Sequence, residues 1–258
     1  MTNFSFRNIF PVLAILWFLV WGCGKQTYEI GHEDPEVEIK KCIALSQKKL
    51  YTEAVECLEI FKSRFPQTQQ GQEAELKIAD NYFQQEQFLL AADSYQSFVK
   101  LHPANPNIDY AMYRTGLSYF REAPKAVDRD QQYLIKAVEQ FRLTLQTLPT
   151  NTYREATQQA LATAEERLAK RIYYIGRFYY RTHEYISSSL RFKELIEKFP
   201  HADLVPKTLY YLTESNLELV RLEEAREAVE RLVTNYPKNR WTNKAQKHYL
   251  RVAQKKGP

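Results

Sequence analysis

The stretch ADNYFQQEQFLLAADSYQSFVKLHP, residues 79–103, carries two small residues and a proline at equal intervals. Ala79 and Ala91 are twelve positions apart, and Pro103 follows Ala91 by another twelve. Tyr95 comes four residues after Ala91, so a bulky side chain lies one helical turn from a small one. Small residues let two helices approach closely, and a proline ends a helix. The stretch therefore predicts two antiparallel helices that pack against each other.

The same pattern occurs five times along the chain. The small residue and its proline are Ala54/Pro66, Ala91/Pro103, Ala137/Pro149, Ser188/Pro200 and Ala225/Pro237. An earlier small residue precedes each pair: Cys42, Ala79, Gly116, Gly176 and Thr213. The pattern resembles the tetratricopeptide repeat, with a basic period of 37 residues between prolines. We therefore expect an all-α protein, a right-handed α-solenoid of five tetratricopeptide-like helical hairpins with a C-terminal capping helix.

Two intervals are longer than the period. The third repeat has nine extra residues between Gly116 and Ala137, and residues 123–130 read as a surface loop that contributes to docking and not to the core. The interval from Pro149 to Gly176 has fourteen extra residues, close to four helical turns, and predicts one long helix over residues 153–181. This helix would join two modules, an N-terminal one over residues 36–150 and a C-terminal one over residues 151–258.

The N-terminus is not part of the repeats. Residues 9–21 are apolar, too few for a comfortable membrane span, and Gly22-Cys23 follows directly, which resembles a bacterial lipobox. We therefore expect a lipoprotein signal peptide over residues 1–22 and a lipid on Cys23, with residues 23–35 as anchor and flexible tether. An ordinary secretory signal, or a short anchor with an incidental cysteine, is the alternative.

Export would place the remaining cysteines in an oxidising compartment. Cys42 and Cys57 belong to the two helices of the first repeat. They are interpreted as two small buried residues, with a disulfide between them as the alternative.

Basic residues gather at the C-terminal end. Residues 238–258 contain seven lysines and arginines and no acidic residue, whereas the whole chain has 36 basic and 31 acidic residues. A stripe of Trp241, Ala245, Tyr249 and Val252 predicts a capping helix that is apolar towards the fifth repeat. Its basic face is either simply solvated or binds an anionic partner or a lipid headgroup.

Motifs of enzymes are absent from the chain. It has no glycine-rich phosphate loop, no Gly-x-Ser-x-Gly and no pair of histidines at ligand spacing, so we expect no catalytic residues, no cofactor and no metal. Residues 171–181 interleave bases with aromatics, but repeat register explains them better than nucleic-acid binding. The expected function is that of a scaffold.

Four blocks of sequence then point to one family. They are PNIDYAMYRTGL at residues 106–117 after His102-Pro103, VDRD at 127–130, AVEQF at 137–141 and RLAK at 167–170. Together with the lipobox, the five repeats, the insertion and the long helix, they resemble the BamD (ComL) family, the tetratricopeptide lipoproteins of the outer-membrane β-barrel assembly machine. The resemblance implies a non-enzymatic lipoprotein that faces the periplasm from the outer membrane.

The resemblance also implies partners. The C-terminal module would dock the last POTRA domain of the barrel protein BamA, and the N-terminal module would meet C-terminal segments of unfolded outer-membrane proteins, which typically end in an aromatic residue. Other lipoproteins of the machine would also bind. The alternative is a periplasmic repeat adaptor for cell-wall or division proteins; a peptidoglycan enzyme lacks candidate residues.

Repeat register selects the residues for these two surfaces. Offsets of −6, −3, +1 and +4 from the first small residue define the inner face of each first helix. In repeats two and three the offsets select Glu73, Leu76, Asp80, Phe83, Tyr110, Tyr113, Leu117 and Phe120. All of these except Glu73 are the residues expected to form the substrate groove. In repeat four they form a cationic aromatic surface for the POTRA partner: Lys170, Tyr173, Arg177 and Tyr180. The alternative is that these aromatics only shield the interior of the superhelix.

Overall fold

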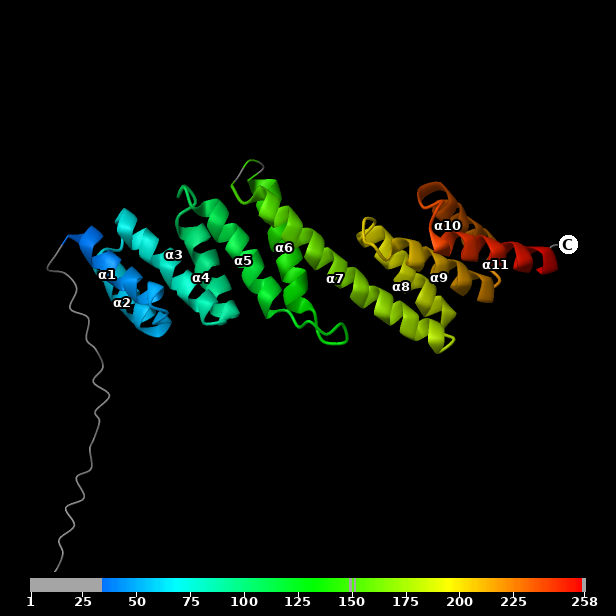
Figure 1. The fold of residues 1–258 in the computed structure, drawn as a ribbon, viewed down its shortest axis with the longest axis horizontal. Helices are drawn as coiled ribbons and strands as arrows, with labels where there is room; N and C mark the ends of the chain where they lie inside the picture. The colour runs from blue at the N-terminus through cyan, green and yellow to red at the C-terminus, as the bar shows by residue number, and fades with distance from the viewer. Residues whose placement is uncertain (1–33, 149, 151, 257–258) are drawn as a thin grey trace, which may run out of the picture.

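The computed structural model describes residues 34–148, 150 and 152–256, which fold into helices joined by turns and loops (Figure 1). The helices are α1 (Pro35–Gln47), α2 (Tyr51–Arg64), α3 (Gln69–Gln84), α4 (Phe88–Leu101), α5 (Ile108–Glu122), α6 (Gln132–Thr147), α7 (Arg154–Arg181), α8 (Tyr185–Lys198), α9 (Val205–Glu218), α10 (Leu222–Asn235) and α11 (Arg240–Lys256). Consecutive helices pair into five hairpins, α1/α2 to α9/α10, and α11 packs on α9 and α10. The all-α solenoid with a capping helix is confirmed.

The small residues form the seams of the hairpins, as predicted. All ten are buried: Cys42, Ala54, Ala79, Ala91, Gly116, Ala137, Gly176, Ser188, Thr213 and Ala225. In the fourth hairpin, the Ser188 hydroxyl donates to the carbonyl of Gly176 at 3.1 Å, which is a contact that only small residues permit. Four of the five repeat prolines lie in the described residues, Pro66, Pro103, Pro200 and Pro237, and each comes two residues after the last helical residue of α2, α4, α8 or α10.

The turn inside four hairpins has one backbone conformation. Its central residue has a φ near +60°, and these residues are Lys49, Glu86, His183 and Val220. Each lies seven positions after the first small residue of its repeat. The following amide donates to the carbonyl five residues earlier, as from Leu50 to Leu45 at 3.0 Å. This is a Schellman cap, which satisfies the last carbonyls of a helix and turns the chain back on itself.

The insertion in the third repeat is a loop between α5 and α6, as predicted, but it is held firmly. Arg167 donates to the carbonyl of Pro124 at 2.8 Å, and Arg171 donates to that of Val127 at 2.6 Å. The amide of Gln131 donates to the carbonyl of Ala126 at 2.9 Å. Ala123 is buried in the hydrophobic core. The expectation that the insertion contributes nothing to the core is therefore wrong at Ala123, because the chain leaves α5 while still covered by neighbouring helices.

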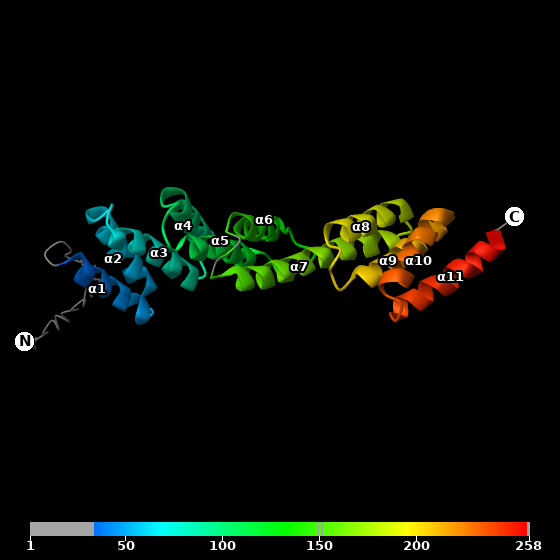
Figure 2. The ribbon, with the colours of Figure 1, turned by 90° about the horizontal axis from the view of Figure 1, so that it is seen from above.

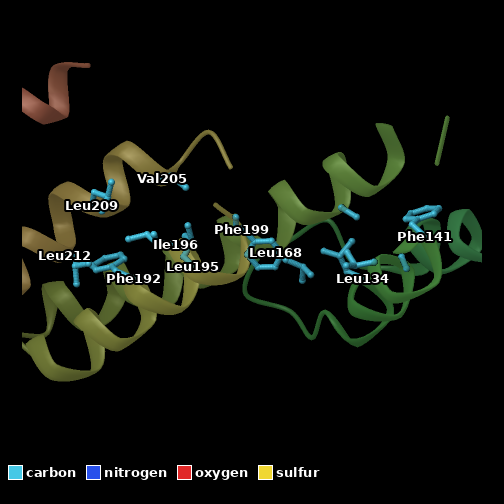
Figure 3. Packing of buried hydrophobic residues seen from close by; sticks show 14 of the residues in the cluster. Leu134, Phe141, Leu168, Phe192, Leu195, Ile196, Phe199, Val205, Leu209 and Leu212 are labelled. Atoms are coloured by element: carbon cyan, nitrogen blue, oxygen red, sulfur yellow. The ribbon is translucent and has the colours of Figure 1, made fainter. Parts of the chain in front are cut away.

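The long helix predicted over residues 153–181 is confirmed as α7, which has 28 residues and Tyr153 at its N-cap. It is roughly 42 Å long at 1.5 Å per residue. One hydrophobic cluster runs from Ala92 in α4 to Ala245 in α11. Figure 3 shows Leu168 of α7 beside Phe199, between the side chains of α6 and those of α8 and α9. The division into modules 36–150 and 151–258 stays a prediction; this cluster extends across their boundary.

Cys42 and Cys57 form a disulfide between α1 and α2. Both residues are buried, as expected, but the preferred interpretation of two unlinked residues is wrong. Repeat register brings the two positions to the same seam, so two cysteines there meet directly. The bond links the two helices of the first hairpin, which within residues 34–148 packs against the second hairpin through α3.

The signal peptide, the lipid on Cys23 and Pro149 lie outside the described residues. None of the helices that the structure describes combines the length and the apolar character needed to cross a membrane.

Candidate functional site

An open groove of about 810 Å³ lies where α3, the loop after α4 and the start of α5 meet. We call it the N-terminal groove. The residues lining it are Gln69, Gln72, Glu73, Leu76, Lys77, Asp80, Leu101, His102, Pro103, Ala104, Asn105, Pro106, Asn107, Tyr110 and Tyr153. The loop is fastened to α3 by two side-chain contacts, from His102 to Glu75 at 2.9 Å and from Asn105 to Gln72 at 2.7 Å. One wall of the groove is therefore a rigid stretch of proline-containing backbone.

Asp80 is the polar centre on the helical side of this groove. Its carboxylate accepts hydrogen bonds from the hydroxyls of Tyr95, at 2.5 Å, and Tyr110. Arg114 donates from Nε to the Tyr95 hydroxyl at 3.0 Å, and its guanidinium lies 3.8 Å from the ring centroid of Phe83. Burial, reinforced by the Asp80 charge, raises the pKa of Tyr95 and of Tyr110 above the usual range. Both tyrosines therefore stay neutral hydrogen-bond donors at neutral pH.

The residues predicted for the substrate groove divide into two sets. Leu76, Asp80 and Tyr110 line the N-terminal groove, as does Glu73. The other four lie elsewhere: Phe83, Tyr113, Leu117 and Phe120 are partly buried and outside this groove.

The long helix explains where those side chains lie. Tyr113 stacks on Tyr153, the N-cap of α7, with ring centroids 5.4 Å apart, and Arg167 of α7 lies 4.8 Å from the ring centroid of Phe120. α7 thus packs over part of the inner face of α5, which repeat register alone does not reveal.

The block of residues 106–117 builds this joint between helices. Asp109 accepts a hydrogen bond from the backbone amide of Thr152 at 3.1 Å, tying the start of α5 to the approach to α7. Tyr110 packs at 5.5 Å from Tyr153, and Gly116 faces Phe141 of α6. Each of these contacts holds one helix against another. The block is therefore a structural joint that borders the N-terminal groove at Pro106, Asn107 and Tyr110.

A second hollow, of about 510 Å³, lies on α7 and α9. We call it the C-terminal surface. Its lining residues are Val127, Lys170, Tyr173, Tyr174, Arg177, Arg181, Leu204, Lys207 and Tyr211. Four of the nine are cations and none is a carboxylate, so the hollow favours an anionic occupant. Lys170, Tyr173 and Arg177 were predicted for this surface, and the structure brings the three together.

Cations and aromatic rings alternate across the C-terminal surface. The guanidinium of Arg177 lies 3.8 Å from the ring centroid of Tyr211 and 5.4 Å from that of Tyr180. Lys207 lies 5.0 Å from the centroid of Tyr173, whose hydroxyl is buried with no hydrogen-bond partner among the described residues. Stacking holds these cations in place while their N–H groups keep donor capacity.

Burial also raises the pKa of two tyrosines here. Burial is the largest cause of the raised pKa at both Tyr173 and Tyr180. The next cause at Tyr173 is the negative charge that Tyr211 would gain on ionising, and the next cause at Tyr180 is the charge of Glu214. Tyr180 does not line the hollow but packs edge-on against Tyr211 at 5.3 Å. Tyr180 therefore supports the C-terminal surface by packing against Tyr211, one of its lining residues.

The sequence interpretation missed the contribution of α9 and α11. Lys207, Tyr210 and Tyr211 come from α9, and Trp241 packs on Tyr210 at 5.0 Å. Applied to Thr213 in the fifth repeat, the same offsets of −6 and −3 select Lys207 and Tyr210, so the signal was present. Tyr211 falls outside those offsets. Across the described part of the chain, no group of histidine, cysteine, aspartate and glutamate residues has an arrangement that would hold a metal ion.

Comparisons with known proteins agree over most of the chain. The family model described as "YfiO: Outer membrane lipoprotein" matches residues 40–228. The chain is 27% identical over 214 residues to "Outer membrane protein assembly factor BamD" of Neisseria gonorrhoeae, covering 78% of this chain and 80% of that protein. It is 30% identical over 199 residues to the protein of the same name from Rickettsia prowazekii (strain Madrid E), covering 77% and 79%. Among solved structures, the TPR2AB-domain:pHSP90-complex of yeast Sti1 aligns at 14% identity and a TM-score of 0.43, over 85% of this chain and 87% of that one.

Proposed function

Because the chain belongs to the family of outer-membrane lipoproteins whose model spans residues 40–228, we propose that it is an assembly factor for outer-membrane proteins. The name shared by its relatives from Neisseria and Rickettsia states this role for them. The observation that carries the proposal is this match, which runs from within α1 to within α10. A solenoid with two differently lined hollows fits a non-catalytic scaffold that holds two other molecules.

The C-terminal surface is the proposed site for the POTRA region of the barrel protein BamA. Four cations without a carboxylate would attract an acidic face, and they are spread over α7 and α9. Tyr173 and Tyr211 supply aromatic anchors of the kind that commonly dominate protein interfaces, and Trp241 of α11 lies beside this surface, 6.2 Å from Tyr211.

The N-terminal groove is the proposed site for C-terminal segments of unfolded outer-membrane proteins. Leu101, Tyr110 and Tyr153 offer apolar contact area, while the adjacent loop carries backbone polar groups that an extended segment can meet. Phe83, Tyr113, Leu117 and Phe120 would support this groove by fixing α5, and would not touch the segment. Asp80 would orient the Tyr110 ring through its hydrogen bond.

A lipid on Cys23 would anchor this scaffold in the outer membrane, with the hairpins in the periplasm. Mass analysis of the mature N-terminus tests this step, and a diacylated or triacylated Cys23 is the expected result. An intact Met1, or cleavage at another position, would contradict it.

Affinity purification of the chain from its native envelope tests the function. We expect the barrel protein and further lipoproteins of the assembly machine to co-purify. Recovery of cell-wall or division proteins without the barrel protein would favour the alternative, a periplasmic repeat adaptor.

A further inference from the structure

The last helix carries a straight stripe of cations. Arg240, Lys244, Lys247, Arg251 and Lys255 of α11 are all exposed. Their spacings of four, three, four and four residues place them on one face of the helix. The stripe is about 22 Å long at 1.5 Å per residue.

None of the ion pairs described in the structure includes a cation of this stripe, and Glu214 of α9 contacts α11 at His248, which is not a member of the stripe. α11 contains no aspartate or glutamate. The ion pairs described for the other surface helices, such as Lys198 with Glu194 at 2.9 Å, place carboxylates beside cations. Along α11, by contrast, like charges follow each other at i, i+4 in three places, an arrangement that weakens a helix. The stripe is therefore an uncompensated field of positive charge that an external anion would relieve.

The opposite face of α11 is already occupied. Thr242 and Ala245 are buried, Tyr249 packs on the core of the solenoid, and Trp241 packs on Tyr210 at 5.0 Å. α11 contacts α9 and α10 through this face. The cationic stripe thus lies on a rigid helix whose apolar side chains are committed to the fold, and α11 offers little apolar surface for insertion into a bilayer.

The composition of the stripe separates two kinds of anionic partner. Protein interfaces are depleted in lysine and centre on aromatic or arginine anchors in desolvated pockets. The stripe has three lysines, and Leu250 is the exposed large hydrophobic side chain beside it. The aromatic ring in α11 that stripe cations approach is Trp241, 4.7 Å from Arg240 and 4.9 Å from Lys244, and this ring is partly buried against Tyr210 of α9. A hydrated contact made by charge alone suits phospholipid headgroups, which attract clusters of lysine and arginine at a membrane surface.

We propose that the stripe on α11 binds anionic phospholipid headgroups at the surface of the membrane in which the chain is anchored. The inference takes that membrane location from the proposed function. α1 and α11 lie at opposite ends of the elongated solenoid (Figures 1 and 2). A lipid near α1 and a headgroup contact at α11 together hold the solenoid along the membrane, because the first attachment raises the effective concentration of the second.

Vesicle flotation tests the proposal, with the mature chain of residues 23–258 carrying Cys23→Ser, so that neither the apolar signal segment nor a lipid is attached. The probes are vesicles of phosphatidylethanolamine with phosphatidylglycerol, and vesicles of phosphatidylethanolamine with phosphatidylcholine. We expect binding to the anionic vesicles only, and its loss as salt rises. Reversing three charges, with Lys244→Glu, Lys247→Glu and Arg251→Glu, should weaken that binding by at least about tenfold.

The matched control reverses two lysines and one arginine elsewhere. Lys100, Arg121 and Lys193 are exposed on α4, α5 and α8, and their change to Glu alters the net charge equally. We expect this control to bind within about twofold of the parent chain, because screening confines charge effects to roughly 8–10 Å. A second variant carries Lys244→Gln, Lys247→Gln and Arg251→Gln. It removes the positive charges without adding negative ones, so the repulsion within α11 falls and a loss of vesicle binding cannot be attributed to a destabilised helix.

Equal loss in both triple variants, or equal binding to both kinds of vesicle, would overturn the proposal. So would unchanged vesicle binding by the α11 variant together with loss of a co-purifying protein, since the stripe would then be a protein site. The vesicle assay needs no assembly partner. A failure of the proposed function in the envelope therefore remains distinguishable from a failure of headgroup binding.

Discussion

A Cβ atom added to Gly116 would lie 2.5 Å from Cε1 of Phe141. Gly176 and Phe192 repeat this relationship in the fourth hairpin, at 2.6 Å. In both hairpins the aromatic ring comes four residues after the small residue of the second helix, and it fills the space that the glycine leaves. The ring therefore packs directly on the glycine, and this contact sets how closely the two helices approach.

Replacing Gly116 should destabilise the third hairpin. Gly116→Leu would overpack the seam against Phe141, and we expect a loss of roughly 1–3 kcal/mol or more in the free energy of unfolding. Chemical denaturation measures it. Arg121→Ala, at an exposed position of the same helix, is the control and should have little effect. Unchanged stability of Gly116→Leu would show that the seam does not set the packing.

Replacing Val220 should have the opposite effect. Val220 has a φ of 59° and is 57% exposed, so a β-branched residue occupies the left-handed region without contributing much to the core. We expect Val220→Gly to stabilise the chain by about 0.5–1 kcal/mol, since relief of the left-handed strain exceeds the added entropy of the unfolded chain. Val233→Gly, inside α10, is the matched control and should destabilise by about 1 kcal/mol. A loss of stability in Val220→Gly would contradict the turn geometry.

Alkaline pH should reveal the buried tyrosines. Burial raises the pKa of Tyr95, Tyr110, Tyr173 and Tyr180 in the folded chain. Their contribution to stability is complete below the unfolded pKa of about 10 and is lost as pH rises towards the folded values. Phenolate absorbance should therefore show a set of tyrosines that ionise near pH 10 in denaturant and at higher pH in the native protein.

Asp80→Asn gives that titration a control. Burial is the largest cause of the raised pKa of Tyr95 and Tyr110, and the Asp80 charge is the next. Because the variant removes that charge, part of the phenolate absorbance that appears at high pH should move to lower pH. Identical native and denatured curves would mean that these hydroxyls are accessible.

The insertion loop should depend on the two arginines of α7. Arg167 and Arg171 donate to carbonyls of Ala123, Pro124, Val127 and Arg129. We expect Arg167→Met with Arg171→Met to speed amide hydrogen exchange in residues 123–131 while the helices stay protected. Arg142→Met, which breaks the exposed ion pair with Glu165, is the control. Exchange that does not change in the loop would show that other contacts hold it.

The repeat pattern could be predicted from local spacing because small residues and prolines act within one hairpin. Cys42 and Gly116 fell on seams for this reason, and α7 was found from the length of its interval. The covering of Tyr113 by Tyr153 could not be predicted, because it depends on the angle at which α7 crosses α5. Tyr211 was missed for a similar reason, since it joins the C-terminal surface through neighbouring helices and not through repeat register.

The central claim is that one scaffold carries two separate binding surfaces. Two variants test the two surfaces separately. Arg177→Glu with Lys207→Glu reverses two cations of the C-terminal surface. Leu101→Asp changes a side chain of the N-terminal groove that is 64% exposed, so its folding cost is small. The controls are Lys100→Glu with Lys193→Glu for the first variant, and Leu90→Asp, on the same helix and 50% exposed, for the second.

The most direct measurement is the affinity of each variant for the purified POTRA region and for a peptide from a barrel C-terminus that ends in phenylalanine. We predict that the Arg177 and Lys207 variant loses at least about tenfold in POTRA affinity, as expected for anchors of an interface, and binds the peptide normally. Leu101→Asp should do the reverse, and both controls should match the parent chain. Equal loss of both partners in each folded variant, or POTRA binding that survives the double charge reversal, would contradict the two-surface account.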